Sequence, residues 1–292
     1  MHKFYNIIII LLIFIIWIIL LKPTTIIDKN NIFFNYPKWE INFAWEKLIT
    51  EGKYYYNKER FDKEYLITSK TLYQLFLYIK RYPLYIPYIE KKLKENNIPD
   101  DFKYLAIAES ALLNNALSHA SASWIWQFMP DTARRFWLIV NDKIDERYNF
   151  EKSTDTAIKY FKVLYNKFNN RTLVAAAFNR WEWWIARALD KQNVNSYYDL
   201  YLNEETSRYV FRILAIKYVL LEYFKNKNII DVLIWWTYKK PKTKTIKINK
   251  IDNIIDWCKE NNVSYKDFIL LNQWIIWDSL PEWDWEIKIL DN

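Results

Sequence analysis

From Tyr65 onward, apolar residues recur at spacings of three and four, the pattern of helices that bury one face. Pro83 and Pro87 interrupt the first run, so we expect one helix to end there and a second to cover Tyr88–Glu95. Further helices are expected over Asp131–Phe136, Ser153–Asn166, Thr172–Asn179, Ile185–Lys191 and Glu205–Tyr223. The pattern therefore predicts a mainly α protein built around a compact all-helical domain.

The pattern changes after a basic, proline-containing linker at 239–244. Residues 245–292 contain a β-like run, two helical stretches and a final β-like run, which predicts a small separate module of β-α-α-β order. The four elements are Thr245–Ile248, Ile254–Glu260, Tyr265–Leu271 and Ile287–Leu290. Residues 23–64 lack a clean period and are expected to form an irregular spacer, followed by a helical N-terminal extension over 65–97.

The first segment of the chain, 1–22, has a different pattern. Ile7–Leu21 is an unbroken apolar run, close to the ~20 residues that span a bilayer. Lys3 precedes the run, which favours a cytoplasmic N-terminus. Because no A-x-A-like cleavage site follows, we expect an uncleaved signal anchor: a single pass through the cell membrane with the remainder on the extracytoplasmic side. A cleaved signal peptide with an atypical site is the alternative.

Composition narrows the possible functions. Apolar residues make up 52% of the chain and charged residues 26%, which excludes a mostly disordered protein. The net charge of +8 favours an anionic partner such as nucleic acid, a membrane surface or a cell-wall polymer. Cys258 is the single cysteine, so no intrachain disulfide can form, and His2 and His119 are too few for a histidine-rich metal site.

Glu109 is the residue with the clearest chemical potential. It follows Phe102, Leu105 and Ala106 by seven, four and three residues, so it lies on the apolar stripe of its helix, which Asp100 or Asp101 can cap. Desolvation there would raise the pKa of the carboxyl toward neutrality, and a protonated carboxyl can donate its proton to a glycosidic oxygen. The alternative is an ordinary glutamate on the helix surface.

Four motifs in and after this helix are similar to those of one enzyme family. The first matches E-S, a later serine and then W-Q-F-M-P-x-T-A at Glu109, Ser110, Ser118, Trp126, Gln127, Phe128, Met129, Pro130, Thr132 and Ala133. The others are Asp145-Glu146-Arg147, Ala177-Phe178-Asn179, and Glu205-Thr206 with Tyr209. Together they resemble the lytic transglycosylases of the soluble-transglycosylase type, in the membrane-bound branch that carries LysM modules. The resemblance covers Ile98 to about Tyr209.

This resemblance implies a lysozyme-like catalytic domain over 98–228 that acts on peptidoglycan glycan strands, with no metal, no cofactor and no nucleic-acid partner. The family cleaves the β-1,4 bond between N-acetylmuramic acid and N-acetylglucosamine without water, leaving a 1,6-anhydro end. Glu109 would act first as the acid and then as the base. Substrate contacts are implied for Ser118, Gln127, Met129, Asn179 and Tyr209.

Some residues depart from this pattern or allow another interpretation. The family usually has tyrosine where Phe178 stands, which puts a contact to Glu109 or to the departing oxygen in doubt. Asp145 and Glu146 are expected to be structural partners of Arg147, so no second carboxylate is expected to match Glu109 in placement. A lysozyme-like hydrolase, which needs that second carboxylate, is one alternative function. A non-catalytic peptidoglycan-binding protein is the other.

The C-terminal module resembles a LysM domain, a peptidoglycan binder, at Ile254-Ile255, Val263-Ser264, Leu270, Asn272 and Leu280-Pro281. Lys250-Ile251-Asp252 stands where LysM domains usually have G-D-T. The resemblance implies a module that holds the enzyme at the wall and raises its local concentration there. A generic α/β appendage is the alternative.

The chain has one glycine and sixteen tryptophans, where about twenty glycines are expected for this length. The family has glycine at the positions of Trp124, Trp137, Trp181, Trp183 and Trp184. Turns in the C-terminal module are expected to hold Trp274, Trp277, Trp283 and Trp285, where glycine is the physical choice. We therefore hypothesise that the gene is read with UGA as glycine, and that most of these positions are glycine in the native protein. The alternative is genuine tryptophan that stacks on sugars, in which case Trp124 would crowd the groove beside Glu109.

Overall fold

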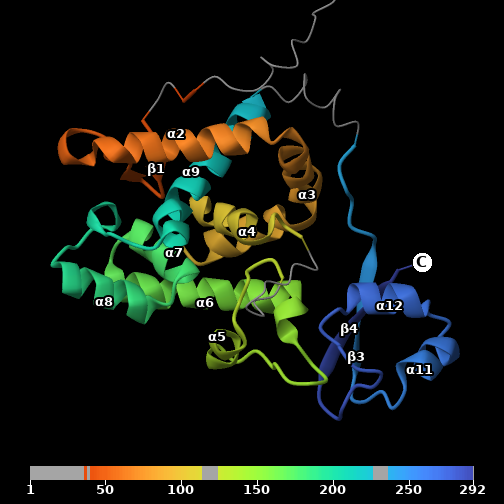
Figure 1. The fold of residues 1–292 in the computed structure, drawn as a ribbon. Coiled ribbons are helices and arrows are strands. Elements are labelled where there is room, and N and C mark those ends of the chain that lie inside the picture. Colours follow the sequence, from red (N-terminus) through yellow and green to blue (C-terminus); the bar gives the residue numbers. More distant parts are fainter. Residues whose placement is uncertain (1–35, 38–39, 114–123, 226–235, 292) are drawn as a thin grey trace, which may run out of the picture. The chain divides into compact units, whose positions relative to one another are not determined.

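The computed structural model describes residues 36–37, 40–113, 124–225 and 236–291 (Figure 1). By its internal contacts the chain divides into two units, Met1–Tyr36 and Pro37–Asn292. The predicted signal anchor at 1–22, Ser118 and His119 lie outside the described residues. Within the described part of the chain, no helix is both long and apolar enough to cross a membrane.

The segment expected to be a spacer is partly folded. A hairpin of strands β1 (Asn42–Phe43) and β2 (Glu46–Lys47) is followed by the 3-10 turn η1 (Gly52–Tyr54) and by helix α2 (Tyr55–Lys70). The hairpin is fixed by polar contacts, because Glu46 accepts hydrogen bonds from the backbone N–H groups that begin a helix more than 120 residues later. Such a contact leaves no periodic signal, so the prediction of an irregular segment was wrong from Asn42 onward.

Helix α3 (Leu72–Glu95) runs through both prolines, contrary to the expected break. Its buried residues keep helical spacing from one end to the other: Leu75, Ile79, Ile86, Ile89 and Leu93. A proline inside a helix costs about 3 kcal/mol, whereas each buried aliphatic side chain contributes about 1.5–3 kcal/mol. The continuous apolar face therefore outweighs the two missing N–H donors.

The remaining helices of the helical part are α4 (Lys103–Ser110), α5 (Pro130–Arg135), α6 (Phe150–Phe168), α7 (Arg171–Asn179), α8 (Glu182–Gln192) and α9 (Glu204–Lys225). The last five were predicted to within about three residues at each end. Asparagine side chains cap α6 and α7, since Asn149 and Asn170 each accept a hydrogen bond from an N–H group in the first turn. Helix α9 is buried around most of its circumference, and it packs against α2, α4 and α7 (Figure 1).

The C-terminal module has the predicted β-α-α-β order. Strands β3 (Thr243–Ile248) and β4 (Trp285–Leu290) pair antiparallel, with Thr243 opposite Leu290 and Ile248 opposite Trp285. Helices α11 (Ile254–Glu260) and α12 (Tyr265–Leu271) lie between them in sequence, with the predicted bounds. The side chain of Asn272, fully buried, bonds to both backbone groups of Lys288 and so attaches the end of α12 to β4.

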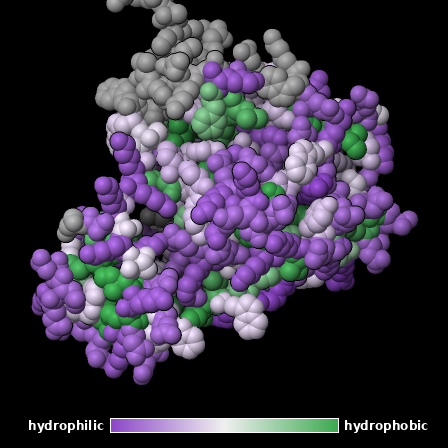
Figure 2. Space-filling view, turned by 180° about the vertical axis from the view of Figure 1, so that it is seen from behind, coloured by the Kyte–Doolittle hydropathy of each residue, from purple (hydrophilic) through white to green (hydrophobic). Residues whose placement is uncertain are grey.

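Figure 2 shows one face of the molecule, on which hydrophilic side chains predominate and apolar ones form smaller areas.

Candidate active site

The helix that carries Glu109 is held at its start by charged contacts. The 3-10 turn η2 (Asp100–Phe102) leads directly into α4. Neither aspartate caps the helix as predicted. Asp101 instead accepts a hydrogen bond from the Ala44 N–H (2.6 Å) and pairs with Lys217 of α9 at 2.7 Å. Lys103 pairs with Glu90 and Asp100. These contacts join the beginning of α4 to the N-terminal hairpin and to α9.

Glu109 lies on the side of α4 that faces α9, where it is half-buried. The hydroxyl of Tyr209 donates a hydrogen bond to Glu109 Oε1 at 2.5 Å, and Tyr209 itself is almost completely buried. Desolvation raises the pKa of Glu109 from 4.5 to about 7, and the charge of Glu205 adds to the rise. The Tyr209 hydrogen bond and the charge of Arg212 act in the opposite direction. The carboxyl can therefore exchange a proton near neutral pH.

The tyrosine is fixed as the proton donor in this hydrogen bond. Desolvation and the neighbouring Glu109 carboxylate raise the pKa of Tyr209 well above its usual range, so the phenol keeps its proton. Among the described residues, Glu109 Oε2 has no hydrogen-bond partner. One carboxyl oxygen is thus held by the protein, and the other is available to a ligand.

The backbone directly after Glu109 is unusually constrained. Ala111 and Leu112 both have left-handed conformations, with φ of 55° and 56°. Arg81 on α3 donates a hydrogen bond to the Ala111 carbonyl at 2.9 Å. Ser110, one of the motif residues, is buried, and its hydroxyl lies 3.0 Å from the Ile125 carbonyl oxygen. Strained backbone held by neighbouring groups in this way is frequent at functional sites.

Two of the predicted site residues meet on one face of α9. Asn179, at the end of α7, accepts a hydrogen bond from the Thr206 hydroxyl at 3.2 Å. Thr206 is three residues before Tyr209, so it lies one turn earlier on the same side of α9 as the partner of Glu109. The E-T-x-x-Y motif thus places the amide of Asn179 and the carboxyl of Glu109 along one helix face. The hydroxyl of Tyr209 contacts the acid itself, and a contact from this residue to substrate stays a prediction.

The W-Q-F-M segment has two buried side chains, Trp126 and Phe128, and two more accessible ones. Trp126 is buried, and its indole N–H donates to the Thr154 hydroxyl at 3.1 Å. Gln127 and Met129 are half-buried, so both can reach a ligand. The Gln127 side-chain amide donates to the Trp124 carbonyl at 2.6 Å. Their predicted roles in substrate binding remain predictions.

The D-E-R motif is structural, as expected. Arg147 and Asp145 form a buried ion pair at 2.6 Å, and Arg147 also donates to the Phe128 carbonyl. Glu146 accepts from the Ile139 N–H and pairs with Lys152. Within the described residues, no group of three or more histidine, cysteine, aspartate or glutamate side chains is arranged to hold a metal.

Three charged residues near the site, Glu64, Arg208 and Arg212, were not predicted from the sequence. Glu64 of α2 is buried and pairs with Arg208 at 2.5 Å and with Arg212 at 3.9 Å, both on α9. Arg212 and Glu205 also act on the pKa of Glu109. Glu64 falls within the segment that lacked a clean period, so no motif or spacing could have identified it.

Three tryptophans have backbone conformations that suit glycine. Trp45, Trp124 and Trp137 have φ values of 70°, 67° and 72°, a region that bulky residues rarely adopt. Trp45 is in the two-residue turn between β1 and β2, after Ala44, which also has positive φ. Trp137 directly follows the end of α5, where the Leu138 N–H bonds to the Ala133 carbonyl in the pattern of a helix end that usually has glycine.

Trp124 differs from the other two in being buried. Its ring lies 5.8 Å from that of Phe150 and 6.5 Å from that of Tyr85. The indole N–H has no hydrogen-bond partner among the residues that the structure describes, whereas the indole N–H of Trp126 donates to Thr154. A buried, unpaired donor costs about 1–3 kcal/mol. Position 124 therefore combines an unfavourable backbone conformation with an unfavourable side-chain environment.

The expectation that the four tryptophans of the module stand at turns was wrong for Trp285. This residue is the first of strand β4, is buried, and donates from its indole to the Pro281 carbonyl at 2.7 Å. Trp274 is also buried, with its ring 5.2 Å from that of Trp285. These two indoles belong to the core of the module as the structure has it.

A half-buried acid hydrogen-bonded to a buried tyrosine, on helices of a mainly α domain, defines a candidate proton-transfer site. Residues 87–199, within the helical part of the chain, match the family model of the transglycosylase SLT domain. The match contains Glu109 and Asn179, while Tyr209 follows its end.

A curated relative comes from Alteromonas sp. (strain M-1), and its name assigns it to tributyltin chloride resistance. It is 29% identical over 106 residues, which are 36% of this chain and 51% of the relative. The chain thus matches about half the length of that relative.

Two solved structures are also similar. An inactive mutant of the lytic transglycosylase Slt from Pseudomonas aeruginosa aligns with a TM-score of 0.38 and 19% identity, over 48% of this chain and 24% of that one. The 70 kDa soluble lytic transglycosylase from Escherichia coli aligns with a TM-score of 0.43 and 19% identity, over 61% and 32%.

Proposed function

We propose that this protein is a peptidoglycan lytic transglycosylase and that Glu109 is its catalytic residue. The observation that carries the proposal is a carboxyl with a pKa near 7, fixed by Tyr209, within a chain that has an SLT domain. A carboxyl with this pKa is partly protonated at neutral pH, so it can serve as an acid and then as a base.

The proposed reaction needs one carboxyl group. Glu109 donates its proton to the glycosidic oxygen as the bond from that oxygen to C1 of N-acetylmuramic acid breaks. The Glu109 carboxylate then removes the proton of the C6 hydroxyl of the same sugar, and O6 bonds to C1. This closes the 1,6-anhydro ring and returns the proton to Glu109, so that atoms and charge balance without water. Asn179 and Gln127 are proposed to bind polar groups of the two sugars, with Met129 beside them.

Two other parts of the chain would keep the enzyme at its substrate. The C-terminal module is proposed to bind glycan as a LysM-type module, which its β-α-α-β order supports. The apolar run Ile7–Leu21 is proposed to anchor the protein in the cytoplasmic membrane, with the enzyme on the extracytoplasmic side. Both would raise the local concentration of the enzyme at the wall.

The test is the release of soluble fragments from purified peptidoglycan, with mass analysis of their ends. The parent protein is expected to release fragments with 1,6-anhydro ends, and Glu109→Gln is expected to release none. Glu260→Gln, at an exposed position on α11, is the matched control and should act like the parent. Reducing ends would establish the hydrolase instead, and equal release by the Glu109→Gln variant would refute the role of this residue.

A further inference from the structure

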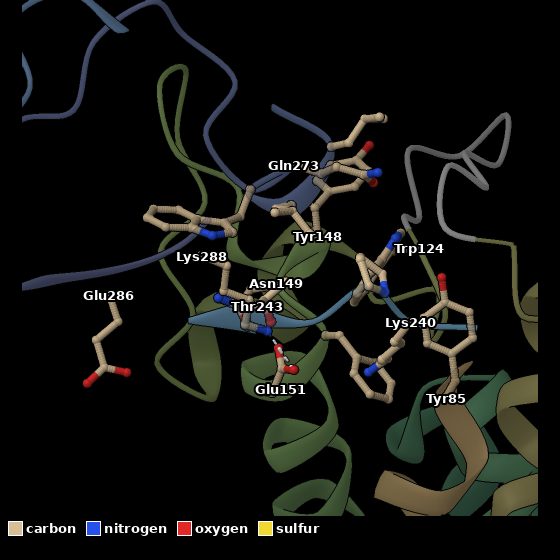
Figure 3. A pocket seen from close by; sticks show the side chains of 15 residues that line it. Tyr85, Trp124, Tyr148, Asn149, Glu151, Lys240, Thr243, Gln273, Glu286 and Lys288 are labelled. Atoms are coloured by element: carbon tan, nitrogen blue, oxygen red, sulfur yellow. Dashed lines mark ion pairs between the residues drawn. The ribbon is translucent and has the colours of Figure 1, made fainter. Parts of the chain in front are cut away.

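A cavity of about 290 Å³ lies between the helical part and the C-terminal module (Figure 3). This volume is at the lower limit for small-molecule sites. Tyr85 and Phe150 line it from the helical part, and Lys240, Trp274 and Lys288 line it from the linker and module. Trp124 also lines it, and Glu109 is not among the lining residues.

The walls of this cavity are joined by direct contacts. The Asp145 N–H donates to the Trp274 carbonyl at 2.8 Å, and the Ile276 N–H donates to the Lys143 carbonyl at 3.0 Å. Ile144 is buried within the apolar core of the module. An ion pair between Lys288 of β4 and Glu151 of α6, at 2.6 Å, closes one side. Because several kinds of contact join the two parts here, the cavity has a defined shape.

Two lysines and two glutamates line the cavity, and only one lysine and one glutamate among them form an ion pair with each other. Lys288 is paired with Glu151, whereas no carboxylate lies within ion-pair distance of Lys240 among the described residues. The Lys240 ammonium instead lies 4.7 Å from the centre of the Phe150 ring and 5.8 Å from that of Tyr85. Figure 3 shows Lys240 beside Tyr85, while the Glu286 side chain points away from the other labelled groups. Lys240 is therefore a cation of the cavity wall that no carboxylate of the described residues meets at ion-pair distance.

Lys240 is exposed as a residue, and partial desolvation of its ammonium lowers its pKa. A ligand carboxylate at this place would pair with the ammonium, and the rings of Tyr85 and Phe150 offer flat surfaces for the apolar face of a sugar. Both features fit a ligand that combines a carbohydrate with an acidic group.

We propose that this cavity binds the carboxylate-bearing peptide attached to a peptidoglycan sugar, with Lys240 as the residue that recognises the carboxylate. The proposal rests on the proposed function, since it names a second part of the same substrate. On this proposal, the residues between the helical part and the C-terminal module distinguish peptides with free carboxylates from peptides whose carboxylates are amidated.

The test measures binding to the full chain carrying Glu109→Gln, so that no turnover occurs. The probes are a disaccharide tetrapeptide with free carboxylates and the same compound with its carboxylates amidated. Replacing Lys240 by glutamine in this background should weaken binding of the free acid about tenfold, with no change for the amidated probe. Lys239→Gln, beside it in sequence and not in the cavity wall, is the matched control and should change neither affinity.

Equal binding of the free acid with and without Lys240→Gln would overturn the assignment, and so would equal binding of both probes by the parent background. Thermal unfolding of each variant shows whether it is folded. The release assay on the protein with Glu109 intact is scored separately. If anhydro products form but Lys240→Gln does not change binding of the free acid, only the proposal for this cavity is refuted. If Lys240→Gln weakens that binding but no anhydro products form, only the proposed reaction is refuted.

Discussion

The raised pKa of Glu109 has a consequence for stability that can be measured without any substrate. Burial favours the protonated carboxyl in the folded protein, so the folded state holds its proton to about pH 7, while the unfolded chain releases it near 4.5. Between these values the folded state binds more protons, and stability falls as the pH rises. Replacing Glu109 by glutamine removes the titrating group and should remove this loss.

The magnitude follows from the two pKa values. One pKa unit corresponds to about 1.4 kcal/mol, so the full shift is worth about 3 kcal/mol at pH 8 and only about 1 kcal/mol at pH 5. Glu109→Gln should therefore be more stable than the parent by these amounts, with the larger gain at the higher pH. The amide oxygen of glutamine can still accept the hydrogen bond from Tyr209.

Urea denaturation at pH 5 and pH 8 measures both differences. The control is Glu260→Gln, because an exposed carboxyl should give the same small difference at both pH values. If Glu109→Gln has the same effect at pH 5 and pH 8, or is less stable than the parent at pH 8, then the carboxyl is not desolvated and the reasoning about its proton fails.

Three further changes test neighbouring features. Tyr209→Phe removes a hydrogen bond that lowers the pKa of Glu109, so the alkaline limb of the pH–rate profile should move to higher pH by about one unit. The control Tyr160→Phe, on α6, should leave this limb where it is. If Tyr209→Phe also leaves the limb unchanged, the argument about the pKa of Glu109 is contradicted. Trp137→Gly should raise the free energy of unfolding by about 1 kcal/mol, because glycine adopts the left-handed backbone conformation without strain. Trp126→Gly should lower the free energy of unfolding by about 3–5 kcal/mol. Denaturant midpoints measure both changes, and a lower stability of Trp137→Gly would contradict the backbone argument. Asn272→Ala leaves buried backbone groups of Lys288 unpaired and should cost about 2–3 kcal/mol, seen as an earlier thermal transition of the module; an unchanged transition would show that this side chain does not hold the strand.

Local signals account for what the sequence predicted well. Helices α11 and α12 were placed at their observed bounds because each begins after a polar cap, Asn253 or Ser264, and has a clear apolar face. Glu109 was selected as the candidate acid because its helix phase and its motif agree. The E-T-x-x-Y motif pointed to Tyr209, but its hydrogen bond to Glu109 joins residues 100 apart in sequence. No periodicity reports such a contact.

The errors have physical causes of the same kind. The hairpin at 42–47 is fixed by Glu46, which bonds to the first N–H groups of α7, and this polar contact is set by tertiary structure alone. The prolines of α3 are unfavourable locally, but the buried face of the whole helix decides. In both cases a long-range contact outweighs the local preference that sequence analysis measures.

The tryptophans differ in backbone conformation and in the environment of the indole, and the glycine hypothesis fits some of them better than others. Trp137 and Trp45 are 85% and 75% exposed at positive φ, so their indoles gain little from burial to offset a backbone cost of about 1–2 kcal/mol. Trp124 is buried, and its N–H finds no partner within the described part of the chain. Trp126, in contrast, has both burial and a partner.

Glycine at 45, 124 and 137 would remove all three conflicts, and glycine at 126 would create a cavity. Mass spectrometry of the protein from its natural source should therefore find glycine at the first three positions and tryptophan at 126. Tryptophan at 45, 124 and 137 would mean that the chain sustains three strained turns without compensation, and the hypothesis of a reassigned codon would have to be abandoned.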